Sequence, residues 1–65
     1  MSAEDSLAAA EQLLARLEET RARLEATDDP EQAIEVLQEL SDLAKQIEAA
    51  LERARTQADE DAAES

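Results

Sequence analysis

Cysteine and histidine are both absent from the sequence, which excludes disulfide bonds, thiol chemistry and ordinary zinc sites. Glycine is absent too, so no glycine-rich loop can hold a phosphate group. Nucleophilic catalysis needs a serine, threonine or cysteine with a base in reach, and Lys45 is the only candidate amine base. The sequence therefore predicts a protein that is not an enzyme and that has no cofactor or bound metal.

Basic residues are scarce, with 6 Lys and Arg against 18 Asp and Glu and a formal net charge of -12. Without a cluster of cations to replace phosphate counterions, we expect no direct binding to nucleic acid. No apolar run approaches the roughly 18 to 20 residues of a membrane span, and anionic membranes would repel the chain. The N-terminal stretch is acidic, unlike a secretory signal, so we expect a cytoplasmic protein.

Aromatic residues are missing and strand formers are few, whereas alanine, glutamate, leucine, glutamine and arginine are abundant. Because these are strong helix formers, the expected fold class is all-α. The sequence predicts an antiparallel two-helix hairpin with helices at about 3–26 and 30–58. This hairpin forms one domain at residues 1–58, and the acidic residues 59–65 are expected to be a disordered tail.

Both predicted helices have start signals. Ser2 is the expected N-cap of the first helix, with Asp5 three residues further on. In the second helix, Pro30 suits the first position, where its missing N–H costs nothing. Asp29 can accept a hydrogen bond from the backbone of Gln32, and the Gln32 side chain can reach back. The sequence therefore predicts a capping box in which Asp29 replaces the usual serine or threonine.

Apolar residues follow a four-three alternation in both predicted helices, which keeps them on one face of each helix. The second helix carries two such stripes, one residue out of phase, which share Leu40, Ile47 and Ala54. If facing residues have numbers that sum to about 57, large residues meet small ones, as when Leu24 faces Ala33. The expected hairpin core consists of Leu7, Leu13, Leu17, Leu24, Leu37, Leu40, Ile47 and Leu51.

The apolar face is wider than a two-helix contact needs. The 12 Leu, Ile and Val residues make a thin core, and small scaffolds without disulfides or metals rely on oligomerisation. We therefore expect the hairpin to pair with a second copy into a four-helix bundle, as a homodimer or a higher oligomer. Arg21 is interpreted as a long stem over the core with its charged head in water. The interface candidates are Leu14, Arg21, Val36, Leu43 and Ala50.

Residues 13–54 contain several short motifs in a fixed order. These are Leu17-Glu18-Glu19, Arg23-Leu24-Glu25, Pro30-Glu31-Gln32-Ala33-Ile34, Leu43-Ala44-Lys45, and then Leu51 and Ala54. In this order they resemble the two-helix pattern of the small subunit of bacterial exodeoxyribonuclease VII. Where that family usually has a glycine and a Leu-Pro-Leu type of turn, this chain has Thr27-Asp28-Asp29-Pro30. The resemblance implies a non-catalytic helical hairpin that binds a large nuclease subunit.

Two functions remain open at this point. The first is an interaction or scaffold protein that acts through homo-oligomerisation. The alternative is an accessory small subunit of a larger enzyme, with the large subunit as its partner. Interfaces with foreign proteins usually depend on Trp, Tyr or Arg anchors, and of these the chain has only five Arg. The composition therefore favours a second copy as the partner.

Overall fold

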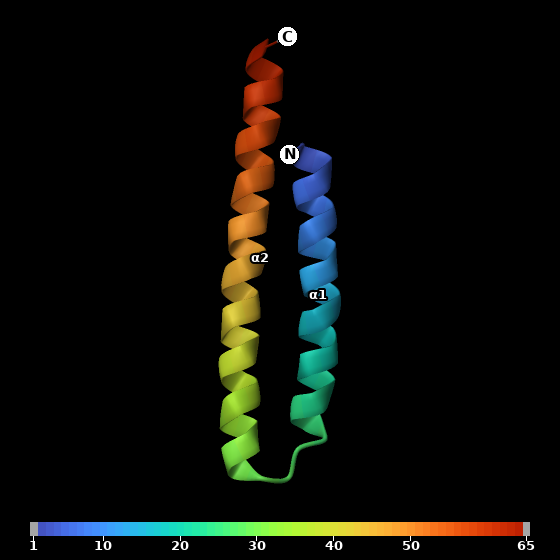
Figure 1. Ribbon diagram of the computed structural model, residues 1–65, viewed down its shortest axis with the longest axis vertical. Coiled ribbons are helices and arrows are strands. Elements are labelled where there is room, and N and C mark those ends of the chain that lie inside the picture. Colours follow the sequence, from blue (N-terminus) through green and yellow to red (C-terminus); the bar gives the residue numbers. More distant parts are fainter. Residues whose placement is uncertain (1, 65) are drawn as a thin grey trace.

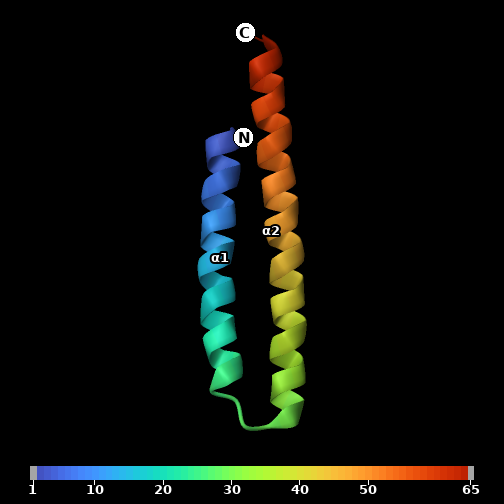
Figure 2. The same ribbon diagram turned by 180° about the vertical axis from the view of Figure 1, so that it is seen from behind.

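A computed structural model describes residues 2–64 and contains two α-helices in that range. Helix α1 spans Ala3–Glu25 and helix α2 spans Pro30–Glu64. The helices lie side by side, and the chain reverses direction at residues 26–29 so that α2 runs back along α1 (Figure 1 and Figure 2). The Cα atoms occupy a rod of 54 × 14 × 13 Å. The prediction of an all-helical protein with two packed helices is confirmed.

The start of α1 is fixed by the residues that were predicted to cap it. The Ser2 hydroxyl accepts a hydrogen bond from the Asp5 N–H at 3.2 Å, and the Ser2 N–H donates to the Asp5 carboxylate at 3.3 Å. This reciprocal pair is a capping box. Glu4 and Asp5 also place negative charge at the positive end of the helix dipole. The prediction of Ser2 as the N-cap is confirmed.

Helix α2 begins at Pro30 as predicted, but the cap uses a different donor. The Asp29 carboxylate accepts from the Glu31 N–H at 3.0 Å, one residue earlier than the predicted donor, Gln32. An N-cap side chain can reach either the second or the third helical N–H, so the residue types alone do not distinguish the two bonds. Asp29 keeps its predicted capping role, and the structure corrects the donor from Gln32 to Glu31.

The turn between the helices needs no glycine, because no described residue has a positive φ. Helix α1 ends with the Ala26 N–H donating to the Ala22 carbonyl at 3.1 Å and the Thr27 N–H donating to the Leu24 carbonyl at 3.2 Å. The Thr27 hydroxyl donates to the Arg23 carbonyl at 2.7 Å. These bonds satisfy carbonyl groups that the end of a helix leaves free.

The tail that was predicted to be disordered is helical over its described part. Residues 59–64 form the last turns of α2 and extend past the N-terminus of α1 (Figure 1). No proline or glycine interrupts α2 after Pro30, and alanine and glutamate both favour helix. The helix therefore continues without packing against α1. The predicted domain begins at Met1 and the predicted tail ends at Ser65, and both of these residues lie outside the described part of the chain.

One seven-residue repeat lines the contact between the helices. Nearly all buried and half-buried residues follow a three-four spacing, which keeps them on one face of each helix. On α1 they are Ala3, Ser6, Ala10, Leu13, Leu17, Thr20 and Leu24, and Thr27 continues the spacing in the turn. On α2 they are Ala33, Val36, Leu40, Leu43, Ile47, Ala50, Ala54 and Gln57. We call these residues the core stripe.

Three predicted interface residues belong to the core of the single chain. Val36, Leu43 and Ala50 are 5% exposed or less. The predicted core residues that do lie in the core stripe are Leu13, Leu17, Leu24, Leu40 and Ile47. The prediction placed the other stripe of α2 against α1, and the structure corrects it. The stripe that faces α1 includes Ala50 and Ala54, whose small side chains let the two backbones approach closely.

Two hydroxyl groups are buried in the core stripe, and both are hydrogen bonded. The Ser6 hydroxyl donates to the Gln57 side-chain oxygen at 2.7 Å, which links the two helices. The Thr20 hydroxyl donates to the Arg16 carbonyl at 2.7 Å in its own helix. No buried side-chain polar atom among residues 2–63 lacks a partner, so these hydroxyls cost the core little. Apolar periodicity alone does not reveal these two residues, although both have the core spacing.

Candidate interaction surface

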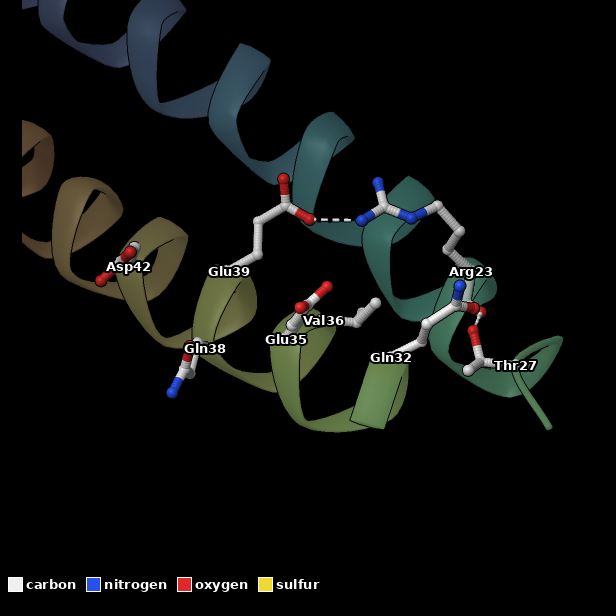
Figure 3. A pocket seen from close by; sticks show the side chains of 8 residues that line it. All are labelled: Arg23, Thr27, Gln32, Glu35, Val36, Gln38, Glu39 and Asp42. Atoms are coloured by element: carbon white, nitrogen blue, oxygen red, sulfur yellow. Dashed lines mark hydrogen bonds and ion pairs between the residues drawn. The ribbon is translucent and has the colours of Figure 1, made fainter. Parts of the chain in front are cut away.

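Residues that directly precede a core-stripe residue lie on one side of the hairpin, which we call the polar flank. Arg23 precedes Leu24, Glu39 precedes Leu40, and their side chains form an ion pair at 2.6 Å across the two helices (Figure 3). The side chains are 60% and 41% exposed. At that exposure the ion pair contributes at most about 1 kcal/mol to the free energy of unfolding. The pair also shows that these positions of the two helices lie on the same side of the hairpin.

An open hollow of about 670 Å³ lies on the polar flank beside this ion pair (Figure 3). Its lining is mostly charged or amide side chains, including Gln32, Glu35, Gln38 and Asp42. No group of three or more potential ligands in the described chain is placed to hold a metal ion. The hollow therefore has the character of a solvated surface, and Gln32 lies here instead of closing the helix cap.

Residues that directly follow a core-stripe residue lie on the opposite side of the hairpin. Each step along a helix turns the side chain by about 100°, and in antiparallel helices these positions come together on one side. Leu7 and Leu14 occupy such positions on α1, and Leu37 and Leu51 occupy them on α2. Ile34 lies one turn before Leu37 on the same side. We call these five residues the apolar flank.

The apolar flank contains every exposed large aliphatic side chain among the described residues. The exposed fractions run from 46% for Leu7 to 57% for Ile34. Leu7, Leu37 and Leu51 were predicted to be hairpin core, and the structure corrects this because the core stripe passes one position before each of them. Leu14 was predicted to lie at an interface, and it is exposed on this flank at 49%.

Arg21 lies in the middle of the apolar flank, seven residues after Leu14. Its guanidinium donates to Glu18 at 3.1 Å and to Glu25 at 2.6 Å. The hydrogen bond with Glu18 and the charges of Glu18 and Glu25 raise the pKa of Arg21 above its ordinary value. The side chain therefore stays charged, and its charge is balanced by two carboxylates of its own helix.

A row of glutamates borders the apolar flank along α1. Its members, Glu4, Glu11, Glu18 and Glu25, are spaced by seven residues, so they share one face. The bonds from Arg21 to Glu18 and Glu25 show that this row lies directly beside the flank. We call these four residues the glutamate row. The matching border along α2 continues the line of Ile34 and is mixed, with Ser41, Glu48, Arg55 and Ala62.

Comparisons with known proteins yield no relative: no family model, no curated protein and no solved structure matches the chain. Over the described residues, neither helix combines the length and the apolar character needed to cross a membrane. Among the described residues, the apolar flank and its borders are the surface from which a function can be inferred.

Proposed function

We propose that this chain is a non-catalytic interaction protein whose antiparallel helical hairpin self-associates through the apolar flank into a four-helix bundle. The observation that carries the proposal is that all exposed large aliphatic side chains among the described residues gather on one flank. Exposed large aliphatic side chains that gather on one flank of a small protein are typical of a binding surface. The opposite flank offers mostly polar and charged groups around the Arg23–Glu39 pair.

The composition of the hairpin core favours a second copy as the occupant. The buried apolar residues of the single chain are Ala10, Val36, Leu43, Ile47, Ala50 and Ala54, and half of them are alanines. So small a core leaves a domain of this size marginal, and the sequence has no cysteine or histidine with which to strengthen it. A second hairpin on the apolar flank would cover another side of each helix, as in four-helix bundles.

The apolar flank has the features that a self-complementary surface needs. Large side chains at Leu14 and Leu51 alternate with the small side chains of Ala44 and Ala58, which are exposed on the same side of α2. Such alternation lets facing helices interdigitate. The one charge within the flank, Arg21, is already paired with carboxylates of its own helix. Its stem could be covered without leaving an unpaired charge.

The area of the flank predicts a weak dimer. Covering the exposed half of a leucine or isoleucine contributes about 1 kcal/mol. Five such residues on each copy contribute about 10 kcal/mol, against an association cost of about 4 to 15 kcal/mol. With an association cost of about 4 to 6 kcal/mol, the remaining free energy of about 4 to 6 kcal/mol corresponds to a dissociation constant between tens of micromolar and about 1 mM. Assembly would therefore depend on protein concentration.

Sedimentation velocity of the full chain, from about 10 μM to about 1 mM, tests the proposal. The mass should rise with concentration from 7.1 kDa towards twice that value. Leu14→Gln/Leu51→Gln should stay monomeric with unchanged helix content, because glutamine and leucine have similar helix propensity. The matched control is Ala8→Gln/Ala22→Gln, which changes two exposed residues outside the flank and should dimerise like the natural chain. A single-copy mass throughout, or normal assembly of the flank variant, would overturn the proposal.

A second candidate function is that of an accessory subunit of a larger enzyme, which the resemblance to the exodeoxyribonuclease VII small subunit implies. The side chains of the apolar flank are exposed in the single chain, so they are also accessible to a large subunit. The chain alone would then remain monomeric at every concentration. It would co-purify with a large subunit, and Leu14→Gln/Leu51→Gln would abolish that co-purification.

A further inference from the structure

We infer that the two copies pack in the same direction, with both turns at one end of the bundle and Arg55 of each copy between Glu4 and Glu11 of the other. This inference rests on the proposed self-association through the apolar flank. It adds the orientation of the second copy and the charged contacts that set it.

Two symmetric arrangements bring one apolar flank onto another. If the two-fold axis runs along the hairpin, α1 of one copy faces α2 of the other and both turns lie at the same end. If the axis runs across the hairpin, α1 faces α1, α2 faces α2 and the turns lie at opposite ends. Neighbouring helices are antiparallel in both arrangements, so the helix dipoles do not favour either one.

The glutamate row opposes the arrangement with the axis across the hairpin. In that arrangement the row on α1 faces the same row of the second copy. Arg21 balances part of the charge of Glu18 and Glu25. Glu4 and Glu11 have no ion pair within the described part of the chain. Because like charges placed opposite each other across an interface are strongly disfavoured, this arrangement is the worse one.

In the arrangement with the axis along the hairpin, contacts between copies have the same register as contacts within one chain. Rotation about that axis leaves every height along the rod unchanged, so α1 meets the α2 of the second copy at the same heights as its own α2. Within the chain, Ser6 meets Gln57 and Arg23 meets Glu39. Side chains that meet therefore have residue numbers that sum to about 62.

This register gives the glutamate row a cationic partner. It places Arg55 of the second copy midway between Glu4 and Glu11, within reach of both long side chains. It also places Leu51 of the second copy between the two leucines that α1 contributes to the apolar flank. Arg55 is free to turn towards this contact, because its side chain is 75% exposed and its pair with Glu52 is long, at 3.9 Å.

The same register places Glu48 of the second copy between Glu11 and Glu18, so the α2 border brings one anion and one cation to the glutamate row. The other arrangement instead places the four glutamates of one copy against the four of the second. Charge and apolar contacts therefore favour the arrangement with the axis along the hairpin.

A distance between the two turns separates the arrangements. The chain has no cysteine, so Asp28→Cys gives one spin label per copy at an exposed turn position. In the inferred bundle the two labels lie at the same end, roughly 20 to 30 Å apart, given helices about 10 Å wide. With the turns at opposite ends, the separation exceeds about 40 Å at a rise of 1.5 Å per residue. Pulsed dipolar EPR at high protein concentration measures this distance.

A charge exchange tests the proposed ion pairs. Arg55→Glu should raise the dissociation constant of the dimer roughly tenfold, because each dimer contains two such sites. Adding Glu11→Arg to Arg55→Glu should restore most of the affinity, because the exchanged pair again brings opposite charges together. The matched control is Arg53→Glu, which changes the net charge equally but lies on the polar flank. Arg53→Glu should change the dissociation constant of the dimer by less than about threefold.

The possible outcomes test the orientation of the two copies and their self-association independently. A short distance between turns together with recovery in the exchanged pair supports the inference. A dimer with a long distance between turns, or equal effects of Arg55→Glu and Arg53→Glu, overturns the inference and leaves the self-association standing. A chain that is monomeric at all concentrations overturns the proposed function itself.

Discussion

Replacing Leu43 with alanine is expected to destabilise the hairpin far more than replacing Leu37. Both leucines belong to α2, but Leu43 is 3% exposed in the core stripe and Leu37 is 52% exposed on the apolar flank. The chemical change is the same, and its effect on helix propensity is the same at both positions. The comparison therefore isolates which of the two stripes of α2 packs against α1.

The expected magnitudes are well separated. Leu43→Ala removes a buried side chain and leaves a cavity, which costs about 2 to 5 kcal/mol. A domain of 65 residues has a free energy of unfolding of about 3 to 10 kcal/mol, so this is a large share of it. Leu37→Ala removes a half-exposed side chain and should cost about 1 kcal/mol or less. At about 4 to 8 °C per kcal/mol, the two Tm values should differ by at least about 4 °C, and by about 15 °C at the middle of these ranges.

Thermal unfolding followed by circular dichroism at low protein concentration, where single copies prevail, measures the difference. At high concentration Leu37→Ala should show an additional loss of stability, because it also weakens assembly. Leu43→Ala should show its full loss at every concentration. A loss for Leu37→Ala that equals or exceeds the loss for Leu43→Ala at low concentration would refute the assignment of the core stripe.

Three further predictions concern salt, the cap of α1 and the buried polar pair. Raising the NaCl concentration should tighten the dimer, since two chains of net charge -12 repel each other; sedimentation showing weaker assembly in salt would contradict this. Ser2→Ala should cost about 1 kcal/mol by removing the capping box, and amide exchange should accelerate in the first turn of α1 while α2 stays protected. Alanine substitutions at Ser6 and Gln57, made singly and together, should give a coupling of about 1 kcal/mol in urea unfolding, and additive losses would show that their hydrogen bond contributes nothing.

The helix starts could be predicted because their causes are local. Ser2 and Asp5 are three residues apart and satisfy each other within one turn. Pro30 fixes its own φ and restricts the residue before it. At the start of α2, the backbone N–H of either Glu31 or Gln32 can donate to the Asp29 carboxylate. In the structure the donor is Glu31. A cap needs no knowledge of the other helix, so residue types and spacing were sufficient to place it.

The facing stripe of α2 could not be predicted in the same way. The two stripes share Leu40, Ile47 and Ala54, so neither is clearly more apolar than the other. The choice depends on how α2 meets α1, where the contact includes Ser6 and Thr20 as well as leucines. Both polar residues interrupt the apolar pattern, but each is hydrogen bonded inside the structure. A search for three-four spacing that accepted small hydroxyl residues would have found the core stripe of α1.

The interaction surface follows directly from that choice. The sequence predicted an apolar face wider than the hairpin covers, and the structure leaves such a surface exposed. The inner and outer members were exchanged: Leu43 and Ala50 lie inside, whereas Leu7 and Leu51 lie outside. Because neighbouring residues on a helix differ by about 100°, a shift of one position is enough to turn a core residue into a surface residue.

A dilution series of the full chain with labelled methyl groups, followed by NMR, shows which side chains enter the contact between copies. We expect the methyl signals of Leu14, Leu37 and Leu51 to shift progressively as the concentration rises, while those of Val36 and Leu43 stay fixed. Signals of Val36 and Leu43 that move with concentration while the three leucines remain unchanged would contradict this expectation.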